Sequence, residues 1–583
     1  MSDFPALFQL NRRDAATGLV ERVPAMERVN ALLAHPEAQR IVRQMDAQSL
    51  HDLIVEHGLS DSSELIQLCS AEQQRAFLDF SMWRRDRLEH EELERWLEVF
   101  LQLEDGELDQ FLDSLDPEVL PLWLREHVGV LFWEHDQDLL DAVDAPLMSS
   151  PDGVYALVVP DEERIGPLLR LLLERVYSLD MDRGRRLLET VRWELSAQLE
   201  EQAHEARWAR LQDLGFPSPE QAPEIIAWLD PGVWRRRIRE RALSAETPPI
   251  VLTAGSLPVR ELHLQRFEAA QLGGEQSVFI RALGGIGQVF PEAHVEPTAD
   301  AILSQFRALA NHVHVLDGAD AGEISGARQA VATAERRLSI ALELVAGDEL
   351  PVASRALGTV PLKLLHRLGY SATQRLRQTA VGLARRGRFQ HVDPPFSLLD
   401  PEEQDRLRGL LQPEPRLGES SAAVFRRVSE IEEAARLLAR MAAVELVLLG
   451  QPGWSREQLL EGFTSPAEDP LTPIELLSLR GLVCTQLLRG DLRESPAPVP
   501  MDELRGLLSV FVDAAALQTA LLERAEVWLD STAVEDRAAR ILVSDWITGA
   551  IARLGDELGS GCPAQVDDTL LLTAFAVGGG GHS

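Results

Sequence analysis

The chain has 583 residues, of which 45% are hydrophobic and 26% are charged. This is the composition of a globular protein with room for roughly three or four domain-sized cores. Its 93 acidic and 57 basic residues give a formal net charge of −36. Because a surface with that charge repels phosphate groups, nucleic acid and anionic membranes are unfavourable partners.

Several further classes are excluded by what the sequence lacks. The first residues, "MSDFPALFQLNRRD", lack the basic and then apolar pattern of a signal peptide. No apolar run approaches the roughly 18 residues of a membrane span. The cysteines at 69, 484 and 562 form no Cys-x-x-Cys pair, which is typical of a reducing compartment. The only lysine, Lys363, follows no glycine loop, so a P-loop is absent. We therefore expect a cytoplasmic protein without membrane insertion.

The N-terminal region, residues 1–145, has the pattern of short amphipathic helices. In Glu91–Leu103, apolar residues recur every three or four positions, which predicts a helix with one buried face. Other Leu-rich helices share a loose form, with an acidic start and a short polar corner. Their irregular repetition predicts a superhelix of helical hairpins, each of which buries its apolar face against its neighbours.

The tripeptide Leu-Asp-Pro occurs three times, at Leu115–Pro117, Leu229–Pro231 and Leu399–Pro401. The aspartate predicts an N-cap, because its carboxylate can accept from free backbone N–H groups of the first turn. The proline then takes the first helical position, where its missing N–H costs nothing. After the third copy, Glu403 stands where a capping box has its second side chain. Each copy therefore predicts a corner between two helices.

Breaks in the helical pattern predict further regions along the chain. We expect a helical domain at 146–245, a central and mostly helical domain at 246–415, a C-terminal helical domain at 416–576, and a flexible glycine-rich tail at 577–583. Strand-like runs are few: Gly153–Val159, Pro249–Thr253 and Ser277–Leu283. The predicted fold class is mainly α, a multidomain helical protein with at most a small β element.

Two resemblances add to this interpretation. The region from about Leu50 to Val130, with "LDPEVL" and the Leu-rich helices around it, resembles the helical superhelix at the cytoplasmic N-terminus of MgtE-type magnesium transporters and in flagellar motor switch proteins. The resemblance implies a fold but no transport, since the metal-binding acidic residues of those transporters have no matching positions here. Segments Leu214–Pro231, Arg307–Glu323 and Leu365–Arg377 resemble a bacterial family known only as a domain of unknown function, which implies no activity.

The stretch "ANHVHVLDGAD" contains the residues that most suggest chemistry. His312 and His314 are two positions apart, and Asp317 follows three residues later. On a strand, residues i and i+2 face the same side, so two imidazoles could bind one metal ion. A competent site would need further ligands from other strands, and the chain lacks the alternating strand and helix pattern of such enzymes. The alternative is a packed or surface pair of histidines.

The run "WRRRIRER" is the one dense basic segment. Its arginines, Arg235, Arg236, Arg237, Arg239 and Arg241, would spread around much of a helix. They could dock an anionic partner or nucleic acid. In so acidic a chain, pairing with carboxylates of the same molecule is the competing interpretation.

These observations favour a non-catalytic role. We expect a scaffold or adaptor whose helical surfaces bind another protein of unknown identity. No catalytic residue and no cofactor is predicted, because the serine-elbow and zinc-protease motifs are missing. The alternative is a metal-dependent enzyme or regulator with a site near His312, His314 and Asp317.

Overall fold

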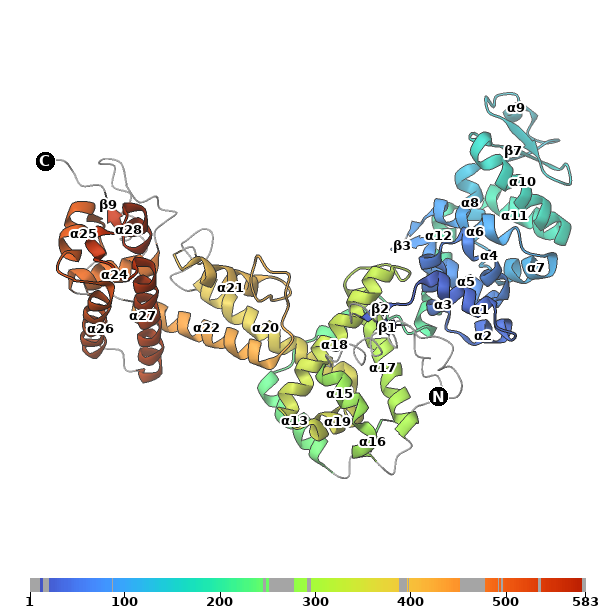
Figure 1. Cartoon of the computed structure of the whole chain (residues 1–583). Coiled ribbons are helices and arrows are strands. Elements are labelled where there is room, and N and C mark those ends of the chain that lie inside the picture. Colours follow the sequence, from blue (N-terminus) through green and yellow to red (C-terminus); the bar gives the residue numbers. More distant parts are fainter. Residues whose placement is uncertain are drawn as a thin grey trace. The chain divides into compact units, whose positions relative to one another are not determined.

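The computed structural model describes residues 11–13, 20–85, 87–244, 248–250, 277–290, 295–386, 396, 398–450, 454, 478–490, 492–493, 496–532 and 536–578. The chain forms two compact units, Met1–Gly369 (unit 1) and Tyr370–Ser583 (unit 2), so their boundary falls within the region predicted as a central domain. Both units consist mainly of α-helices, which confirms the predicted fold class (Figure 1). Among the described residues, no helix combines the length and the apolar character that a membrane crossing needs.

Unit 1 begins with a β-hairpin and a series of short helices. These elements are β1 Asn11–Arg13, β2 Val20–Arg22, α1 Ala25–Leu33, α2 Ala38–Gln44, α3 Ala47–His57, η1 Ser60–Ser62, α4 Ser63–Leu68, α5 Ala71–Ser81, β3 Trp83–Arg84, β4 Arg87–Leu88, α6 His90–Phe100, α7 Asp105–Ser114 and α8 Val119–His127. Helix α5 packs against α3, α6 and α7. In α6 the predicted stripe is buried, including Leu93, Trp96 and Phe100, which confirms the amphipathic pattern.

A small antiparallel sheet follows, in the strand order β5-β7-β6. Its elements are β5 Gly129–Phe132, α9 Gln137–Leu140, β6 Leu147–Ser149 and β7 Tyr155–Val158. Strand β7 is central, and it places Tyr155 opposite Phe132 of β5 and Ala156 opposite Ser149 of β6. The predicted strand at Gly153–Val159 is confirmed.

Further helices complete unit 1; the first three continue the apolar core of the preceding helices, and the others surround a second apolar core. They are α10 Glu162–Leu179, α11 Met181–Trp193, α12 Ser196–Asp213, η2 Ala222–Ile226, α13 Pro231–Leu243, α15 Val278–Gly284, α16 Ile286–Val289, α17 Val295–Leu316, α18 Ile324–Ala346 and α19 Leu350–Thr359. Helix α20, Leu362–Arg386, begins in unit 1 and ends in unit 2. Buried side chains from Ile225 to Leu368 form this core, with Phe279 stacked on Phe306.

The predicted strand at Ser277–Leu283 is wrong, because these residues cap and form α15. Ser277 accepts from Ile280 N at its start. A short apolar run buried on all sides has the same pattern in a helix as in a strand, so periodicity could not decide. The other predicted run, Pro249–Thr253, lies outside the described residues from Val251 onward.

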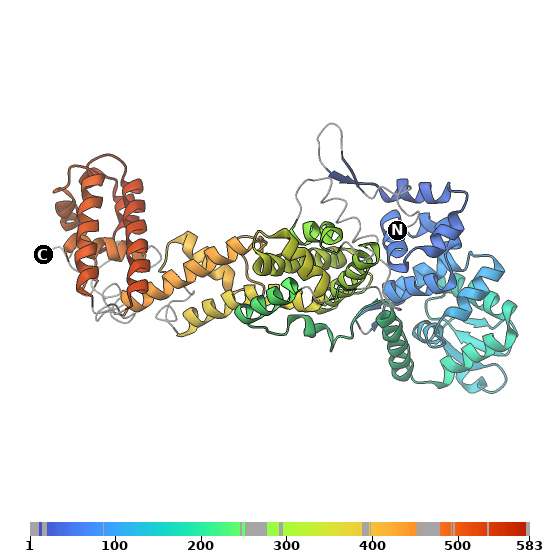
Figure 2. The same ribbon diagram turned by 90° about the horizontal axis from the view of Figure 1, so that it is seen from below.

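Unit 2 is a second helical body, in which α26 and α27 lie side by side (Figures 1 and 2). Its elements are α21 Pro401–Leu411, α22 Val428–Val447, α24 Leu479–Arg489, β8 Val499–Pro500, α25 Met501–Leu508, α26 Ala514–Ser531, α27 Arg537–Leu558, η5 Pro563–Gln565, α28 Asp568–Ala574 and β9 Val577–Gly578. Strand β9 pairs in parallel with β8. Val577 and Gly578 are therefore not part of a free tail as predicted, and residues 579–583 lie outside the description.

The three Leu-Asp-Pro corners differ in what the aspartate does. Asp230 is an N-cap as predicted, since its carboxylate accepts from Val233 N at 2.8 Å. Asp116 is not, because its carboxylate accepts from Arg210 and helix α8 starts only at Val119. Asp400 occupies the N-cap of α21 without a capping hydrogen bond, and the predicted capping box with Glu403 does not form.

Arg210 is the centre of a buried ionic network in unit 1. Its Nε and Nη2 donate to the two carboxylate oxygens of Asp79, at 2.7 and 2.6 Å. Its Nη1 and Nη2 donate to Asp116, at 2.9 and 2.6 Å. One guanidinium on α12 thus holds the end of α5 and the corner before α8 together through two bidentate contacts, the strongest geometry for such pairs.

Candidate binding groove

The predicted metal ligands lie on a helix, so the strand geometry behind that prediction is wrong. His312 and His314 belong to α17, and Asp317 follows its end. Each helical residue turns the side chain by about 100°, so positions i and i+2 point in nearly opposite directions.

Both histidines are instead bound to carbonyl oxygens. His312 Nδ1 lies 2.8 Å from Ala308 O, and His314 Nε2 lies 2.6 Å from Asp320 O. A carbonyl oxygen only accepts, so each of these nitrogens carries a proton and is closed to a metal ion. Burial lowers the pKa of His312. Over the described part of the chain, no group of three or more His, Cys, Asp or Glu side chains could hold a metal ion.

The basic run forms helix α13, and its arginines fall into two sets. Arg239 donates to Val345 O at 2.7 Å and pairs with Glu349, while Arg241 donates to Thr359 O at 3.1 Å. These two arginines fasten α13 to α18 and α19. The other three, Arg235, Arg236 and Arg237, are exposed and have no carboxylate partner among the described residues. The expected pairing of these arginines with acceptors of the same molecule therefore holds for Arg239 and Arg241 only.

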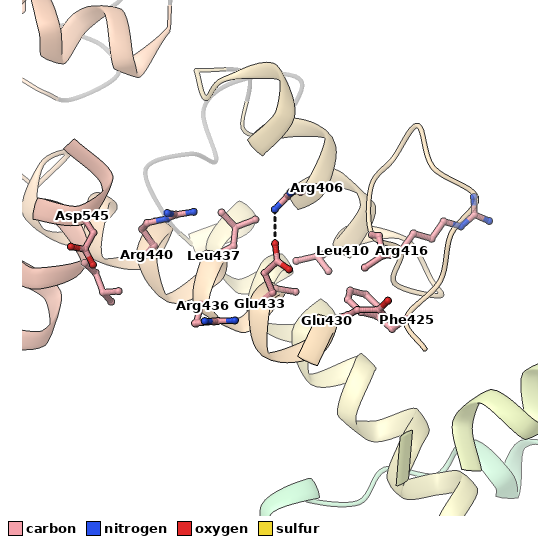
Figure 3. A pocket seen from close by; sticks show the side chains of 13 residues that line it. Arg406, Leu410, Arg416, Phe425, Glu430, Glu433, Arg436, Leu437, Arg440 and Asp545 are labelled. Atoms are coloured by element: carbon pink, nitrogen blue, oxygen red, sulfur yellow. Dashed lines mark hydrogen bonds and ion pairs between the residues drawn. The ribbon is translucent and has the colours of Figure 1, made fainter. Parts of the chain in front are cut away.

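A cavity formed by described residues lies in unit 2 and was not predicted from the sequence. It has a volume of about 770 Å³, within the range of ligand sites. Its walls come from α21, the loop 412–427, α22 and α27 (Figure 3). We call it the groove; its lining is Arg406, Leu410, Arg416, Leu417, Phe425, Glu430, Glu433, Ala434, Arg436, Leu437, Arg440, Leu542 and Asp545.

Two glycines allow the loop to lie directly on α21. A Cβ on Gly409 would come within 2.5 Å of the carbonyl carbon of Gly418, so the two backbones touch. The loop is also tied by hydrogen bonds from Arg416 N to Gly409 O at 3.0 Å and from Ser420 N to an oxygen of Asp405 at 2.7 Å. This close packing fixes the wall that carries Arg416 and Phe425 (Figure 3). Leu417 belongs to the same loop and also lines the groove.

Helix α22 supplies the opposite wall through one of its faces. Glu430, Glu433, Ala434, Leu437 and Arg440 recur at the spacing of a single helical stripe. Glu430 also starts the helix, because its Oε2 accepts from Arg426 N at 2.7 Å and from Arg427 N at 3.0 Å.

The cations of the groove are only partly neutralised. Arg406 pairs with Glu433 at 2.9 Å, the contact drawn in Figure 3, and with Glu402 at 3.0 Å. Arg436 and Arg440 have no carboxylate partner among the residues that the structure describes. Their spacing of four residues places both on the same side of α22, one turn apart.

The remaining lining of the groove consists of two exposed charged residues and a few apolar side chains. Arg416 also has no carboxylate partner within the described ranges, but its guanidinium points away from α22 (Figure 3). Asp545 on α27 is exposed to solvent. The apolar lining that solvent reaches includes Leu417, which is 36% exposed, and the half-buried Ala434 and Leu542. The groove thus offers uncompensated positive charge beside a modest apolar surface.

Sequence reasoning missed this groove, although part of its signal is visible. The predicted boundary between the domains 246–415 and 416–576 falls in the loop of the groove, and the Arg436–Arg440 spacing lies within an ordinary amphipathic helix. The residues of α27 that line the groove come more than 100 positions after Arg436 and Arg440 in the sequence. Only tertiary packing brings them together, and local sequence patterns do not predict such packing.

Comparisons with known proteins give a family and nothing finer. No curated protein and no solved structure matches the chain. The likeness of Leu50–Val130 to magnesium transporters and flagellar switch proteins is not found in these comparisons and stays a prediction. The model of one family matches residues 6–575, nearly the whole length. The chain therefore belongs to the family of unknown function DUF6178.

Proposed function

We propose that this protein is a non-catalytic scaffold or adaptor that binds an acidic segment of a partner protein in the groove of unit 2. One observation carries the proposal. In a chain with a net charge of −36, the groove places Arg436 and Arg440 side by side without carboxylate partners in the described structure. Complementary charge gives such a surface its specificity for acidic partners.

The form of the groove favours a peptide segment over an enclosed small molecule. Arg406, Glu433 and Arg436 in its walls are exposed to solvent, whereas small-molecule sites bury most of their ligand. Leu417 supplies an apolar contact next to the charged side chains. We therefore expect the segment to combine carboxylates with one or two aliphatic side chains.

Site-specific photo-crosslinking of the full chain in its native cell tests the proposal. A benzoylphenylalanine at Leu417 would report contacts in the groove, and one at Leu446 is the matched control. Leu446 lies on α22, is 59% exposed and does not line the groove. We expect capture from position 417 alone, with mass spectrometry mapping the crosslink to an acidic segment of the partner.

Charge reversal separates binding in the groove from chance proximity. Arg436→Glu combined with Arg440→Glu should abolish the crosslink. Arg375→Glu is the matched control, because Arg375 is exposed on α20 and is not part of the groove. The proposal is wrong if the double reversal leaves capture unchanged, if the captured segment is not acidic, or if native mass spectrometry finds a small anion there instead.

A further inference from the structure

A second, smaller cavity adjoins the groove. Its volume is about 20 Å³, enough for one group of the size of a water molecule. Arg440 and Asp545 line both cavities, so the smaller one opens beside the arginine that the groove presents. Its lining is Asp400, Glu403, Arg440, Asp545, Trp546, Gly549, Ala550 and Arg553.

Two polar atoms in this lining are buried and lack a hydrogen-bond partner among the described residues. They are Oε1 of Glu403 and Nε of Arg440. Glu403 is only 5% exposed, so contact with the bulk solvent does not satisfy its Oε1. Buried polar atoms in native proteins are normally paired, and an unpaired one calls for a group that is missing from the description. A single small polar group in the cavity could form hydrogen bonds with both atoms.

The two atoms differ in what they can offer. Arg440 Nε carries a hydrogen and can only donate. Glu403 donates if it is protonated and accepts if it is ionised. Burial, and then the carboxylate of Asp400, raise the pKa of Glu403, while Arg553, Arg440 and a hydrogen bond with Trp546 act in the opposite direction. Burial prevails, so this side chain keeps its proton to a higher pH than an exposed glutamate does.

The surrounding charges leave Arg440 available. Asp400 is already held by Arg480 at 3.2 Å and by Arg553 at 3.0 Å, and Asp545 faces solvent. The charged groups that act on Glu403 or line its cavity are Asp400 before α21, Arg440 of α22, and Asp545 and Arg553 of α27. Arg480 of α24 contacts Asp400 and pairs with Glu557 of α27. With Glu403 neutral, no ionised group of the cavity is committed to the guanidinium of Arg440.

We propose that the small cavity is a carboxylate subsite of the groove, in which one oxygen of an acidic side chain accepts hydrogen bonds from Arg440 Nε and from protonated Glu403. This subsite rests on the proposed function, because the acidic side chain belongs to the segment in the groove. An ionised Glu403 would repel the incoming carboxylate and attract Arg440 itself. Where the pH is high enough to ionise Glu403 in the free protein, binding of the segment therefore takes up a proton.

The test uses the purified full chain and a fluorescein-labelled peptide of alternating glutamate and leucine, followed by fluorescence anisotropy from pH 5.5 to pH 8. Over this range the glutamates of the peptide stay ionised. We expect affinity to fall as pH rises, by up to tenfold per pH unit for one linked proton. The control peptide has glutamine in place of glutamate and should bind weakly at every pH.

Two variants assign the effect to the subsite. Glu403→Gln keeps a donor without a titrating proton, so its affinity should stay high and independent of pH. Arg440→Lys keeps the positive charge but loses the Nε–H, so it should bind more weakly at pH 5.5. Circular dichroism of each variant checks that it folds.

The outcomes separate the two proposals. A flat pH profile for the unmodified chain, or an unchanged pH dependence in Glu403→Gln, overturns the carboxylate subsite and leaves the groove as a binding site. Equal binding of the glutamate and glutamine peptides, or no binding at any pH, overturns both. If the unmodified chain binds the glutamate peptide tightly at low pH, and Glu403→Gln still binds it tightly at pH 8, both proposals are supported.

Discussion

Replacing Arg210 with leucine should destabilise unit 1 far more than removing a typical surface arginine. The change leaves Asp79 and Asp116 without the cation that holds four of their contacts. Their side chains are only 2% and 11% exposed, so solvent cannot replace the lost partner. Breaking a buried pair on one side costs about 3–5 kcal/mol.

Two features place the expected loss of unfolding free energy near the lower end of this range, at about 3 kcal/mol. Arg207 is also close enough to act on Asp79. In addition, burial already raises the pKa of Asp79, so the unpaired carboxyl can take up a proton and limit the penalty. A group with a raised pKa in the folded state stabilises it at low pH and loses that contribution as pH rises. The deficit of Arg210→Leu should therefore deepen between pH 5 and pH 8.

Hydrogen exchange measured by mass spectrometry suits this test, because the chain has two units and a single unfolding midpoint would mix them. Peptides from α5 and α12 should lose roughly a hundredfold in protection, which corresponds to about 3 kcal/mol. Arg95→Ala is the control, since its pair with Glu92 is 62% and 39% exposed and should contribute at most about 1 kcal/mol. Equal effects of the two changes would refute the reasoning.

The same network allows a recovery experiment. Arg210→Leu combined with Asp79→Asn and Asp116→Asn removes the two carboxylates that the first change leaves without their main partner, while Arg207 keeps its hydrogen bonds to the carbonyl oxygens of Asp79 and Arg85. We expect protection in α5 and α12 to return in part, because the penalty lies in the unpaired carboxylates more than in the absence of the arginine. No recovery in the triple variant would show that packing of the arginine side chain was the larger contribution.

Three further predictions follow from local contacts. Asp230→Ala should cost about 1 kcal/mol, measured as faster hydrogen exchange in peptides of α13, because a helix cap is lost. Asp400→Ala should cost more in peptides of α21, because it removes the carboxylate that pairs with the buried Arg480 and the exposed Arg553; the opposite order would contradict the assignment of the two corners. Gly322→Ala should destabilise by about 1–3 kcal/mol, since a Cβ there lies 2.4 Å from Phe80 O, whereas Gly382→Ala meets nothing within 4 Å and should be neutral or slightly stabilising; hydrogen exchange of peptides around each glycine measures the contrast. Of the three thiols, half-buried Cys562 should react first with a disulfide reagent at pH 8, because the other two are buried and burial raises their pKa to about 12; one rapid equivalent is expected, and three would contradict the burial.

The sequence by itself determined the features that depend on neighbouring residues. The helical class, the buried stripe of α6, the strand β7 and the cap at Asp230 all follow from patterns within a few positions. Such signals are reliable because helix hydrogen bonds and caps join residues three or four apart. The two arginines of the groove are likewise visible as a pair one helical turn apart.

Only the tertiary structure decided the rest. Asp116 and Asp400 stand in the same tripeptide as Asp230, yet their carboxylates serve arginines that are 94 and 80 residues away. The helix at Ser277–Leu283 and the paired strand at Val577–Gly578 also depend on what packs around them. A buried carboxylate goes to the strongest donor within reach, and which donor comes within reach depends on long-range packing. The groove, its walls and its subsite have the same origin.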